Sequence, residues 1–518
     1  MMKLKDIEKS PNKNLYLLFL SVLVGLTAGF LASLYRLALE KAETLGREIY
    51  HFVSLHLMFI PFLVISLVII AGIVSLFMKW FPMSSGSGIP QVKGQLQGYF
   101  RNNWFTTAFS KFIAGTLAMF AGLSLGREGP SIQLGAAMGQ MVSDRLAQTE
   151  RHKRILIASG ASAGLSAAFN APLSGVMFTL EEVFKYFSPL ILLTCMTSAM
   201  VADVVSRIIF GEGAVFHFQI SGSIALSDYW LLLILGVILG FFGAFYNWTL
   251  LSSQRLMSKI RLPFVRVVIS FLSVGLMALI FPIVIGSGHI LMDSFSFGMG
   301  LGFLCLILIA KYFISMVSYA SGVPGGIFFP LLVLGASLGA VYATIVLAAF
   351  HLPSHLFANF VILSMAGTFT AIVRAPMTGI LLLVEMTGSF DHLLPLALVS
   401  LVAYVIADLL GSEPIYDSLL ERMLSARNGD EEISEGQMMF ETMVQFDAKA
   451  DHKRLEQLAL PEGVLLVSIH RSGKDLIPRG KTELQAGDYL TFLVNREDEV
   501  VAREQIRKIL TEKTSISS

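Results

Sequence analysis

One carboxylate, Glu128, stands in a glycine-rich break within a strongly apolar part of the chain, in the sequence Gly126-Arg127-Glu128-Gly129-Pro130. A carboxylate at membrane depth is costly unless it is paired or functional. Because burial disfavours the charged form, such a group could bind and release protons near neutral pH. A deprotonated Glu128 could occupy the place of an anion, and a protonated one would leave it. A buried Arg127–Glu128 pair that only braces the turn is equally compatible with these residue types.

Two more glycine-rich breaks precede apolar runs, Gly86-Ser87-Gly88-Ile89-Pro90 and Gly325-Gly326-Ile327-Phe328-Phe329-Pro330. In all three breaks a proline stands where a helix could begin, since proline has no N–H to satisfy there. A helix N-terminus presents free N–H groups and the positive end of a dipole, so it can hold an anion. Glycine and proline could instead serve only packing and kinks, as in many membrane helices. Three such breaks in one duplicated framework favour anion binding.

The breaks belong to an internal duplication. Residues around Gly86 and Lys111 return 200 positions later, and after a small insertion the offset becomes 204. Many transporters consist of two halves that meet around a mid-membrane site made of broken helices. The repeated pairs include Gly86 and Gly286, Ser87 and Ser287, Lys111 and Lys311, Pro130 and Pro330, Pro172 and Pro376, and Glu181 and Glu385.

The composition indicates a membrane protein. Hydrophobic residues make up 54% of the chain and charged residues only 14%, whereas a soluble chain has about 25% charged residues. Apolar segments, such as 15–38, 155–182 and 376–410, follow one another through most of the sequence. Several others are shorter than the roughly 20 residues of a simple span, which suggests half-helices buried inside protein. We therefore expect an all-α polytopic protein in a lipid bilayer.

Other classes of function find little support. The sequence has no nucleophile–base spacing, metal-ligand cluster or phosphate-binding P-loop, so we expect no enzyme, no metal site and no cofactor. The net charge of +1 gives no reason to expect nucleic-acid binding. The two cysteines, Cys195 and Cys305, lie inside apolar runs, where buried reduced thiols are expected.

Charge and composition divide the chain into six parts. Lysines precede the first apolar run and a basic cluster occupies residues 151–154, so the positive-inside bias places both in the cytoplasm. The predicted parts are a cytoplasmic N-terminal lead (1–14), a first membrane repeat (15–212), a connector (213–227), a second membrane repeat (228–422), a linker (423–436) and a small cytoplasmic α+β domain (437–518).

The last part is soluble in character and rich in predicted strands. Two sets of apolar residues alternate as in half-buried strands: Leu465, Val467 and Ile469, and Leu490, Phe492 and Val494. A closing helix is expected from residue 497 to residue 510.

The membrane motifs resemble those of the CLC family of chloride channels and chloride/proton exchangers. Matching stretches cover nearly all of residues 15–422 in family order. They are the three breaks, the segment Phe169-Asn170-Ala171-Pro172-Leu173 that leads to Glu181-Glu182, and Glu413-Pro414-Ile415-Tyr416. The resemblance implies the CLC fold of two inverted repeats with broken and re-entrant helices, and a homodimer with one anion pore per subunit.

The resemblance also implies a role for each matching position. Glu128 would be the outer gating glutamate, which competes with chloride and carries the proton. Serine at position 87 is similar to chloride-preferring members rather than nitrate-preferring plant members. Phe329, where many members have alanine, is expected to have little effect on ion choice. The hydroxyls of Ser87 and Tyr416 and the N–H groups of Ile327 and Phe328 would hold a central chloride, and those of Arg127, Glu128 and Gly129 would help form an outer site.

The pair Glu181-Glu182 ends an apolar helix that is expected to start after Asn170-Ala171-Pro172. From the residues alone, one of them could lie at the cytoplasmic mouth of a proton path, or the pair could be a helix end that reaches water. By the resemblance, Glu182 aligns with the inner proton glutamate of the exchangers, where channel members usually carry an apolar residue. We therefore expect exchange of chloride for protons. The alternatives are a passive voltage- or ligand-gated chloride channel and, more remotely, a ligand-sensing membrane protein.

Residues 440–511 resemble the C-terminal regulatory domain of bacterial potassium-uptake regulators, called RCK-C or TrkA-C. The similarity rests on residues 476–480 and 484–488. It implies a bacterial source, pairing of the domains and, as in some members, cyclic di-AMP bound at the interface. By that resemblance His470, Arg471, Ile477 and Pro478 are the candidate ligand contacts. A purely structural dimerising module is the alternative.

Overall fold

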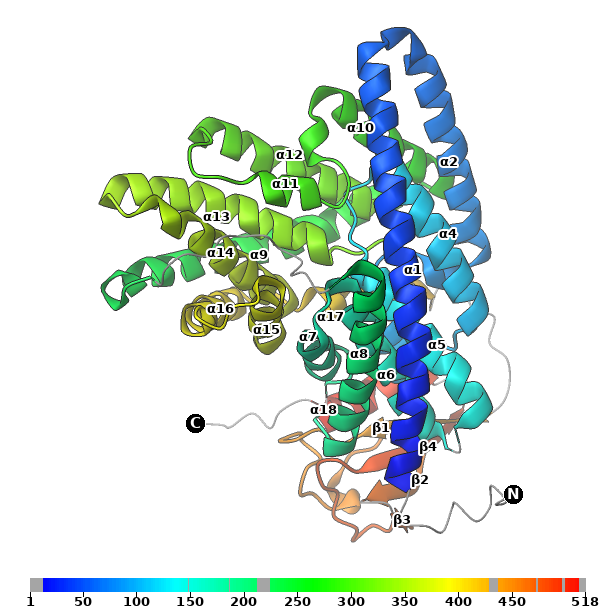
Figure 1. The fold of residues 1–518 in the computed structure, drawn as a ribbon. Helices are drawn as coiled ribbons and strands as arrows, with labels where there is room; N and C mark the ends of the chain where they lie inside the picture. The colour runs from blue at the N-terminus through cyan, green and yellow to red at the C-terminus, as the bar shows by residue number, and fades with distance from the viewer. Residues whose placement is uncertain are drawn as a thin grey trace. The chain divides into compact units, whose positions relative to one another are not determined.

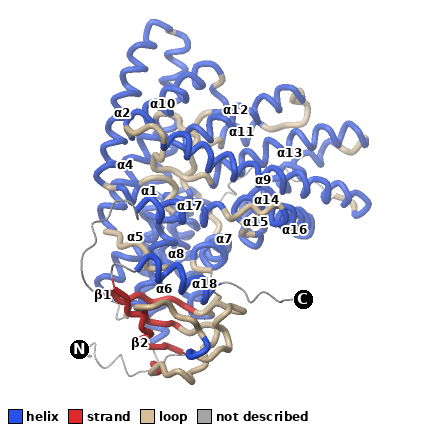
Figure 2. The backbone as a smooth tube through the Cα atoms, turned by 180° about the vertical axis from the view of Figure 1, so that it is seen from behind, coloured by secondary structure: helices blue, strands red, loops and turns tan. Residues whose placement is uncertain are grey.

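The computed structural model describes residues 13–147, 149–185, 187–211, 224–427, 437–471, 474–495 and 499–511. The chain divides into two compact units. The first contains residues 1–93 and 102–419, and the second contains residues 94–101 and 420–518. In the described ranges the first unit is helical, and the β-strands lie in the second (Figures 1 and 2).

Helices of the first repeat begin where proline or a polar residue starts a turn. They are α1 (Lys13–Leu55), α2 (Ile60–Trp80), α3 (Ile89–Leu96), α4 (Trp104–Phe120), α5 (Glu128–Leu146), α6 (Glu150–Phe169), α7 (Pro172–Phe178) with a π-helical turn at Thr179–Val183, and α8 (Pro189–Phe210).

The second repeat follows the same order. It contains α9 (Tyr229–Ser258), α10 (Pro263–Ile280), α11 (His289–Ser294), α12 (Leu301–Ala320), α13 (Phe328–Phe350), α14 (Phe357–Val373), α15 (Pro376–Thr387), α16 (Leu393–Leu409) and α17 (Ile415–Arg427). Short 3-10 turns occupy Leu57–Phe59, Pro82–Ser84, Leu226–Asp228, Pro282–Val284 and Ser354–Leu356.

Hydrogen bonds between the two repeats show the duplication as a pseudo-two-fold relation. The N–H of Gly86 donates to the carbonyl of Gly322 at 2.9 Å, and the N–H of Gly286 donates to the carbonyl of Gly122 at 2.8 Å. The two bonds are equivalent under the duplication, because Gly286 is the repeat counterpart of Gly86 and Gly322 is that of Gly122. Gly126 and Gly326, which are repeat counterparts, form an antiparallel bridge with N···O distances of 2.6 and 2.8 Å.

Small residues let the central helices approach closely. A Cβ on Gly135 would collide with the carbonyl of Gly160, so α5 and α6 are in backbone contact there. In the second repeat a Cβ on Gly339 would lie 2.6 Å from the Ser364 hydroxyl, between α13 and α14. Such contacts suit membrane helices, whose association depends on close packing rather than on water.

Eight helices in the described ranges are long and apolar enough to cross a membrane, and two shorter apolar helices accompany them. Three predicted segments differ from the structure. The segment 155–182 is broken at Asn170, which has φ of 52°, and the segment 376–410 is broken at Gly388, with φ of 69°. The segment 15–38 continues to Leu55 because Arg36 and Glu40, and Glu43 and Arg47, pair across one helical turn.

The second unit contains a four-stranded antiparallel sheet in the order β1-β4-β2-β3. The strands are β1 (Gln437–Met443), β2 (Val464–Arg471), β3 (Lys474–Leu476) and β4 (Tyr489–Asn495). A 3-10 turn at Leu455–Gln457 and the closing helix α18 (Glu499–Thr511) complete the unit. Figure 2 shows the strands in red.

The predicted alternation is confirmed on β4 but is wrong in phase on β2. Leu490, Phe492 and Val494 are buried on β4, as expected. On β2 the pairing with β4 shifts between Leu466 and Ser468. Because a bulge advances the pleat by one residue, Leu466 and Ile469 are buried while Leu465 and Val467 are exposed.

Candidate functional site

The N-termini of α5 and α13 meet where Gly126 pairs with Gly326. The first N–H groups of a helix have no partner within the helix, and the helix dipole adds positive potential at that end. The Ser87 break lies against the same point, because a Cβ on Gly129 would collide with the Ser87 hydroxyl. All three predicted glycine-rich breaks therefore converge on one place, which favours negative charge.

The Glu128 carboxylate is fully buried at this place. Its Oε2 accepts a hydrogen bond from the backbone N–H of Phe329 at 3.3 Å, across the interface between the repeats. Its Oε1 has no hydrogen-bond partner among the described residues. Arg127 pairs with Glu40 at 2.7 Å, and no Arg127–Glu128 ion pair occurs in the described ranges. The carboxylate thus sits on a helix N-terminus in the manner of a bound anion rather than bracing its own turn.

Two serines that are repeat counterparts have opposite surroundings. The Ser87 hydroxyl is buried and has no hydrogen-bond partner among the described residues. The Ser287 hydroxyl donates to the Glu43 carboxylate at 2.7 Å. Buried hydroxyls are nearly always hydrogen-bonded in native proteins. The unsatisfied Ser87 hydroxyl is therefore a donor available to a ligand, whereas the donor of Ser287 is already used.

Tyr416 supplies a second buried hydroxyl without a described partner. It lies in the first turn of α17, and its ring stands edge-on to Phe178 with centroids 6.2 Å apart. Phe178 in turn packs on Phe328, with centroids 5.7 Å apart. These contacts fix the Tyr416 ring near the start of α13 and leave its buried hydroxyl available to a ligand.

Phe329 packs beneath His289, with ring centroids 3.9 Å apart, and against Phe169 at 6.4 Å. The Phe329 N–H still reaches Glu128. The side chain thus packs on two aromatic rings while the backbone N–H meets the carboxylate. Its small effect on ion choice stays a prediction.

Glu182 lies in a cluster of four charged groups, of which Glu182 and Lys93 are buried and Lys185 and Asp417 are partly exposed. Its Oε1 accepts from the Nζ of Lys93 at 2.8 Å, and the two side chains are only 2% and 1% exposed. Lys93 also contacts Asp417, which pairs with Lys185 at 2.5 Å. Buried charges must be paired or they destabilise the fold, and here two cations balance two carboxylates. Glu182 is thus not a helix end that simply reaches water.

Glu181 has a different role from its neighbour. Its carboxylate accepts hydrogen bonds from the N–H groups of Met377 and Thr378, at 3.2 and 2.8 Å, and from the Thr378 hydroxyl. Glu385 does the same for Leu173 and Ser174 in the other repeat. Glu181 of the first repeat therefore caps α15 of the second repeat, and Glu385 of the second repeat caps α7 of the first. This reciprocal capping explains why the glutamate is duplicated.

Sequence reasoning missed Lys93, Lys185 and Asp417. The sequence did place two of them close to predicted site residues, since Lys93 lies six residues after Ser87 and Asp417 directly follows Tyr416. It also missed the charged residues of α1 that contact the site, although their spacing of four residues predicts pairing on a helix. Of these, Glu40 binds Arg127 and Glu43 binds Ser287.

The four candidate residues of the second unit lie together on one hairpin. His470 and Arg471 end β2, which pairs with β3, and Ile477 and Pro478 follow β3. The Arg471 guanidinium is held by Asp488, with two contacts of 2.6 Å. These hydrogen bonds raise the pKa of Arg471. Ile477 is 81% exposed, so it is open to an apolar ligand, whereas Arg471 would have to leave Asp488 to meet a phosphate.

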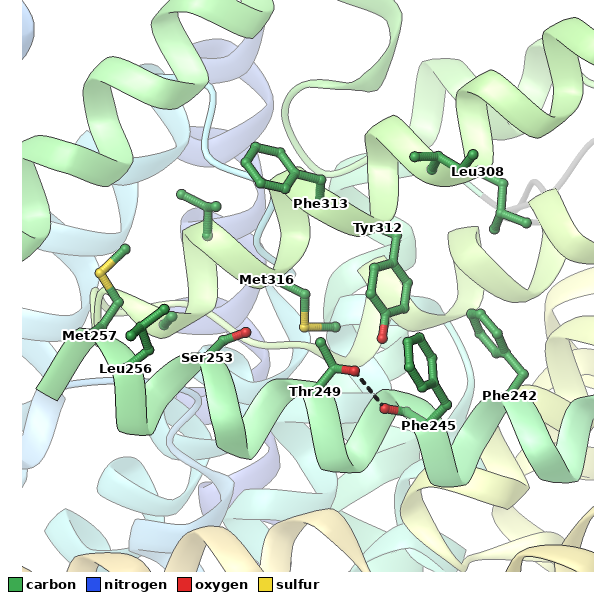
Figure 3. Close-up of a pocket in the computed structure, with 13 residues that line it drawn as sticks. Phe242, Phe245, Thr249, Ser253, Leu256, Met257, Leu308, Tyr312, Phe313 and Met316 are labelled. Atoms are coloured by element: carbon green, nitrogen blue, oxygen red, sulfur yellow. Dashed lines mark hydrogen bonds between the residues drawn. The ribbon is translucent and has the colours of Figure 1, made fainter.

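A separate pocket of about 600 Å³ lies between α9 and α12 (Figure 3). Its walls are apolar side chains such as Phe242, Phe245, Leu256 and Phe313, and Tyr312 is its largest polar residue. None of the predicted site residues lines it. In the described ranges no three His, Cys, Asp or Glu side chains gather as a metal site would require.

Comparison with known proteins gives two family matches. The voltage gated chloride channel family matches residues 68–408, and the TrkA-C domain matches residues 439–506. A protein named H(+)/Cl(-) exchange transporter ClcA from Vibrio cholerae serotype O1 is 36% identical over 422 residues, which covers 79% of this chain and 89% of the relative. The protein of the same name from Klebsiella pneumoniae is 33% identical over 440 residues, covering 82% and 92%. The crystal structure of a slow cyanobacterial Cl-/H+ antiporter has a TM-score of 0.74 at 30% identity, covering 80% of this chain and 99% of that chain.

Proposed function

Because the chain belongs to the voltage gated chloride channel family, we propose that it is a secondary transporter that exchanges chloride for protons across the membrane. One observation carries this proposal: the Glu128 carboxylate takes a backbone N–H at the N-terminus of α13. A chloride ion and an ionised carboxylate compete for such a donor because both need positive potential. Protonation of Glu128 removes its charge, so the neutral side chain leaves and chloride enters.

Chloride meets donors on two sides in this mechanism. The hydroxyls of Ser87 and Tyr416 are buried and without described partners, and they donate to a central ion together with the N–H groups of Ile327 and Phe328. The N–H groups of Arg127, Glu128 and Gly129, in the first turn of α5, help to form an outer site. Helix N-termini and hydroxyls hold an anion without full opposite charge, so the ion is bound but can also leave.

The proton follows a separate path on one side of the site. Glu128 carries it at the place of ion competition, and Glu182 exchanges it with the cytoplasm. Both carboxylates are buried in the first unit, between the candidate membrane spans 57–80 and 189–210. Ionisable groups buried in membrane proteins are rare and usually functional. Because one location alternates between chloride and carboxylate, chloride movement in one direction is tied to proton movement in the other.

The test uses purified protein in liposomes with an outward chloride gradient, while external pH and chloride efflux are followed together. The wild type should drive protons uphill. Glu128→Gln and Glu182→Gln should both lose proton movement and keep chloride flux, because neither amide can carry the proton. Glu181→Gln is the matched control and should keep coupling. Chloride flux without proton movement in the wild type would instead identify a passive channel.

The second unit is the regulatory part of this proposal. Its hairpin gathers His470, Arg471, Ile477 and Pro478 on one edge, and cyclic di-AMP is the ligand that their types suit, with an exposed apolar surface for the bases and basic groups for the phosphates. Isothermal titration of the full-length protein with cyclic di-AMP tests this idea. The idea is supported if the wild type binds cyclic di-AMP and the Ile477→Asp variant does not. Equal heat flow for the wild type and the variant would contradict it.

The protein is expected to be a homodimer with its N-terminus and its second unit in the cytoplasm. The basic residues before α1 and at 151–154 support this orientation through the positive-inside bias. A cysteine placed at Ser518 in a cysteine-free background should be protected from an impermeant maleimide in intact cells. The mass of the detergent-purified protein should correspond to two chains.

A further inference from the structure

We propose that Lys93 is a positioning residue for proton transfer, which holds Glu182 in its ionised form and passes to Asp417 when Glu182 takes up a proton. This inference rests on the proposed exchange of chloride for protons and adds a residue to it. Lys93 would connect the proton step to the two segments that bind chloride, since it lies on α3, which follows Ser87, and Asp417 lies on α17, next to Tyr416.

The geometry distinguishes Lys93 from the other buried lysines of the first unit. Lys111 donates to the carbonyls of Ser84 and Gly86, and Lys311 donates to those of Val284 and Gly286, at 2.7–3.0 Å. These two are repeat counterparts that satisfy chain turns. Lys93 instead contacts two carboxylates, Glu182 and Asp417. A cation shared between two carboxylates can shift from one to the other without being left unpaired.

The duplication offers an independent argument. Glu181 returns as Glu385, and both cap helices, so the fold itself explains them. Glu182 returns as Met386 and Lys93 returns as Asp293. Met386 is buried and Asp293 is exposed. The duplicated framework thus needs neither member of the Lys93–Glu182 pair, and both occur only in the repeat that carries the unsatisfied Ser87 hydroxyl.

Charge balance gives the direction of the effect. The groups that face Glu182 are Lys93 from α3, Lys185 from the segment after the π-helical turn, and Asp417 and the neutral Tyr416 from α17. With Glu182 ionised, two cations balance two carboxylates. A proton on Glu182 leaves one buried positive charge in excess, so Lys93 opposes protonation. Its contact with Asp417 limits that cost, because the ammonium keeps one carboxylate partner.

The experiment measures proton transport by proteoliposomes as a function of pH on the Glu182 side. Lys93→Met should move the midpoint of this profile to higher pH by about one unit or more, as expected when an opposite charge within 4–6 Å is removed. Chloride flux should change less than about threefold, because Lys93 pairs with Glu182 and Asp417 and not with a group proposed to hold chloride. Lys93→Arg should restore the wild-type profile because it keeps the charge.

Lys185→Met is the matched control, since it removes a cation that pairs with Asp417 and has no direct contact with Glu182 among the described ion pairs. Its profile should move less than that of Lys93→Met. Should Lys93→Met not fold, Lys93→Gln removes the charge and keeps a donor for Glu182. If the pH profile of proton transport is unchanged in Lys93→Met or Lys93→Gln, the inference about Lys93 is wrong, while the proposed exchange function still stands. A wild type that moves chloride without protons would overturn the proposed function, and this inference with it.

Discussion

At the scale of single residues, the difference between Ser87 and Ser287 shows how one duplicated position can have two uses. Both serines follow a glycine that turns the chain with a positive φ. The Ser287 hydroxyl is satisfied by Glu43, whereas the Ser87 hydroxyl has no described partner. Since an unsatisfied buried donor destabilises the protein unless a ligand meets it, the asymmetry supports the proposal that Ser87 donates to chloride.

This asymmetry makes a prediction about chloride affinity. Ser87→Ala should weaken chloride binding about tenfold, because a hydrogen bond to a charged group contributes about 1.5 kcal/mol. Ser287→Ala should leave chloride affinity unchanged and lower the thermal stability, since it leaves the Glu43 carboxylate short of a donor. Isothermal titration with chloride and thermal unfolding would measure the two effects. Equal loss of affinity in both variants would contradict the assignment of Ser87.

The sequence alone predicted the helix starts at the three glycine-rich breaks, because such a start depends on the local glycine and proline residues. It could not give the partner of Glu128, which comes from a segment 201 residues away. Nor could it give the Lys93–Glu182 pair, because the side chains meet only when α3 and the π-helical turn pack together. Long-range pairing of this kind has no signal in spacing.

At the scale of elements, the helix caps exchanged between the repeats hold the two halves together. Glu181 receives the first N–H groups of α15, and Glu385 receives those of α7. The sequence predicted one long segment at 155–182 and another at 376–410. It missed the break at Gly388, which is a single left-handed residue within an apolar run. A helix that starts after Asn170-Ala171-Pro172 was expected, and α7 confirms it. A new helix, α7, can begin directly after the break at Asn170 because Glu385 accepts hydrogen bonds from its first N–H groups.

Glu181→Gln and Glu385→Gln should each destabilise the protein by about 1 kcal/mol, the usual value of a helix cap and its charge at the N-terminus. The amide oxygen still accepts one hydrogen bond, so the loss should be partial. Neither variant should abolish proton coupling, in contrast to Glu182→Gln. Thermal unfolding and the liposome assay together check this, and loss of coupling in Glu181→Gln without loss of stability would assign it to the proton path instead.

At the scale of the whole molecule, every residue proposed to meet chloride or the proton belongs to the first unit, and the second unit is a compact unit of its own. The prediction of a small α+β domain is confirmed by its sheet and by α18. Within this unit α18 contacts the segment 94–101, which connects α3 to α4. Arg503 donates to the carbonyl of Gln97 at 3.3 Å, and its guanidinium lies 5.6 Å from the centroid of the Tyr99 ring.

Deleting residues 430–518 should therefore leave coupled exchange in place, because no ion-binding or proton-carrying group is removed. The segment 94–101 loses the contacts of α18, so the deletion should lower thermal stability more than it lowers flux. Arg503→Ala is the matched control, since it keeps the domain and removes the contacts of the Arg503 guanidinium with Gln97, Tyr99 and Phe440. Liposome flux and thermal unfolding of both proteins would be compared with the wild type. Loss of chloride flux in a deleted protein that remains folded would mean that the second unit is required for transport, and the chain would then be primarily a ligand-controlled membrane protein.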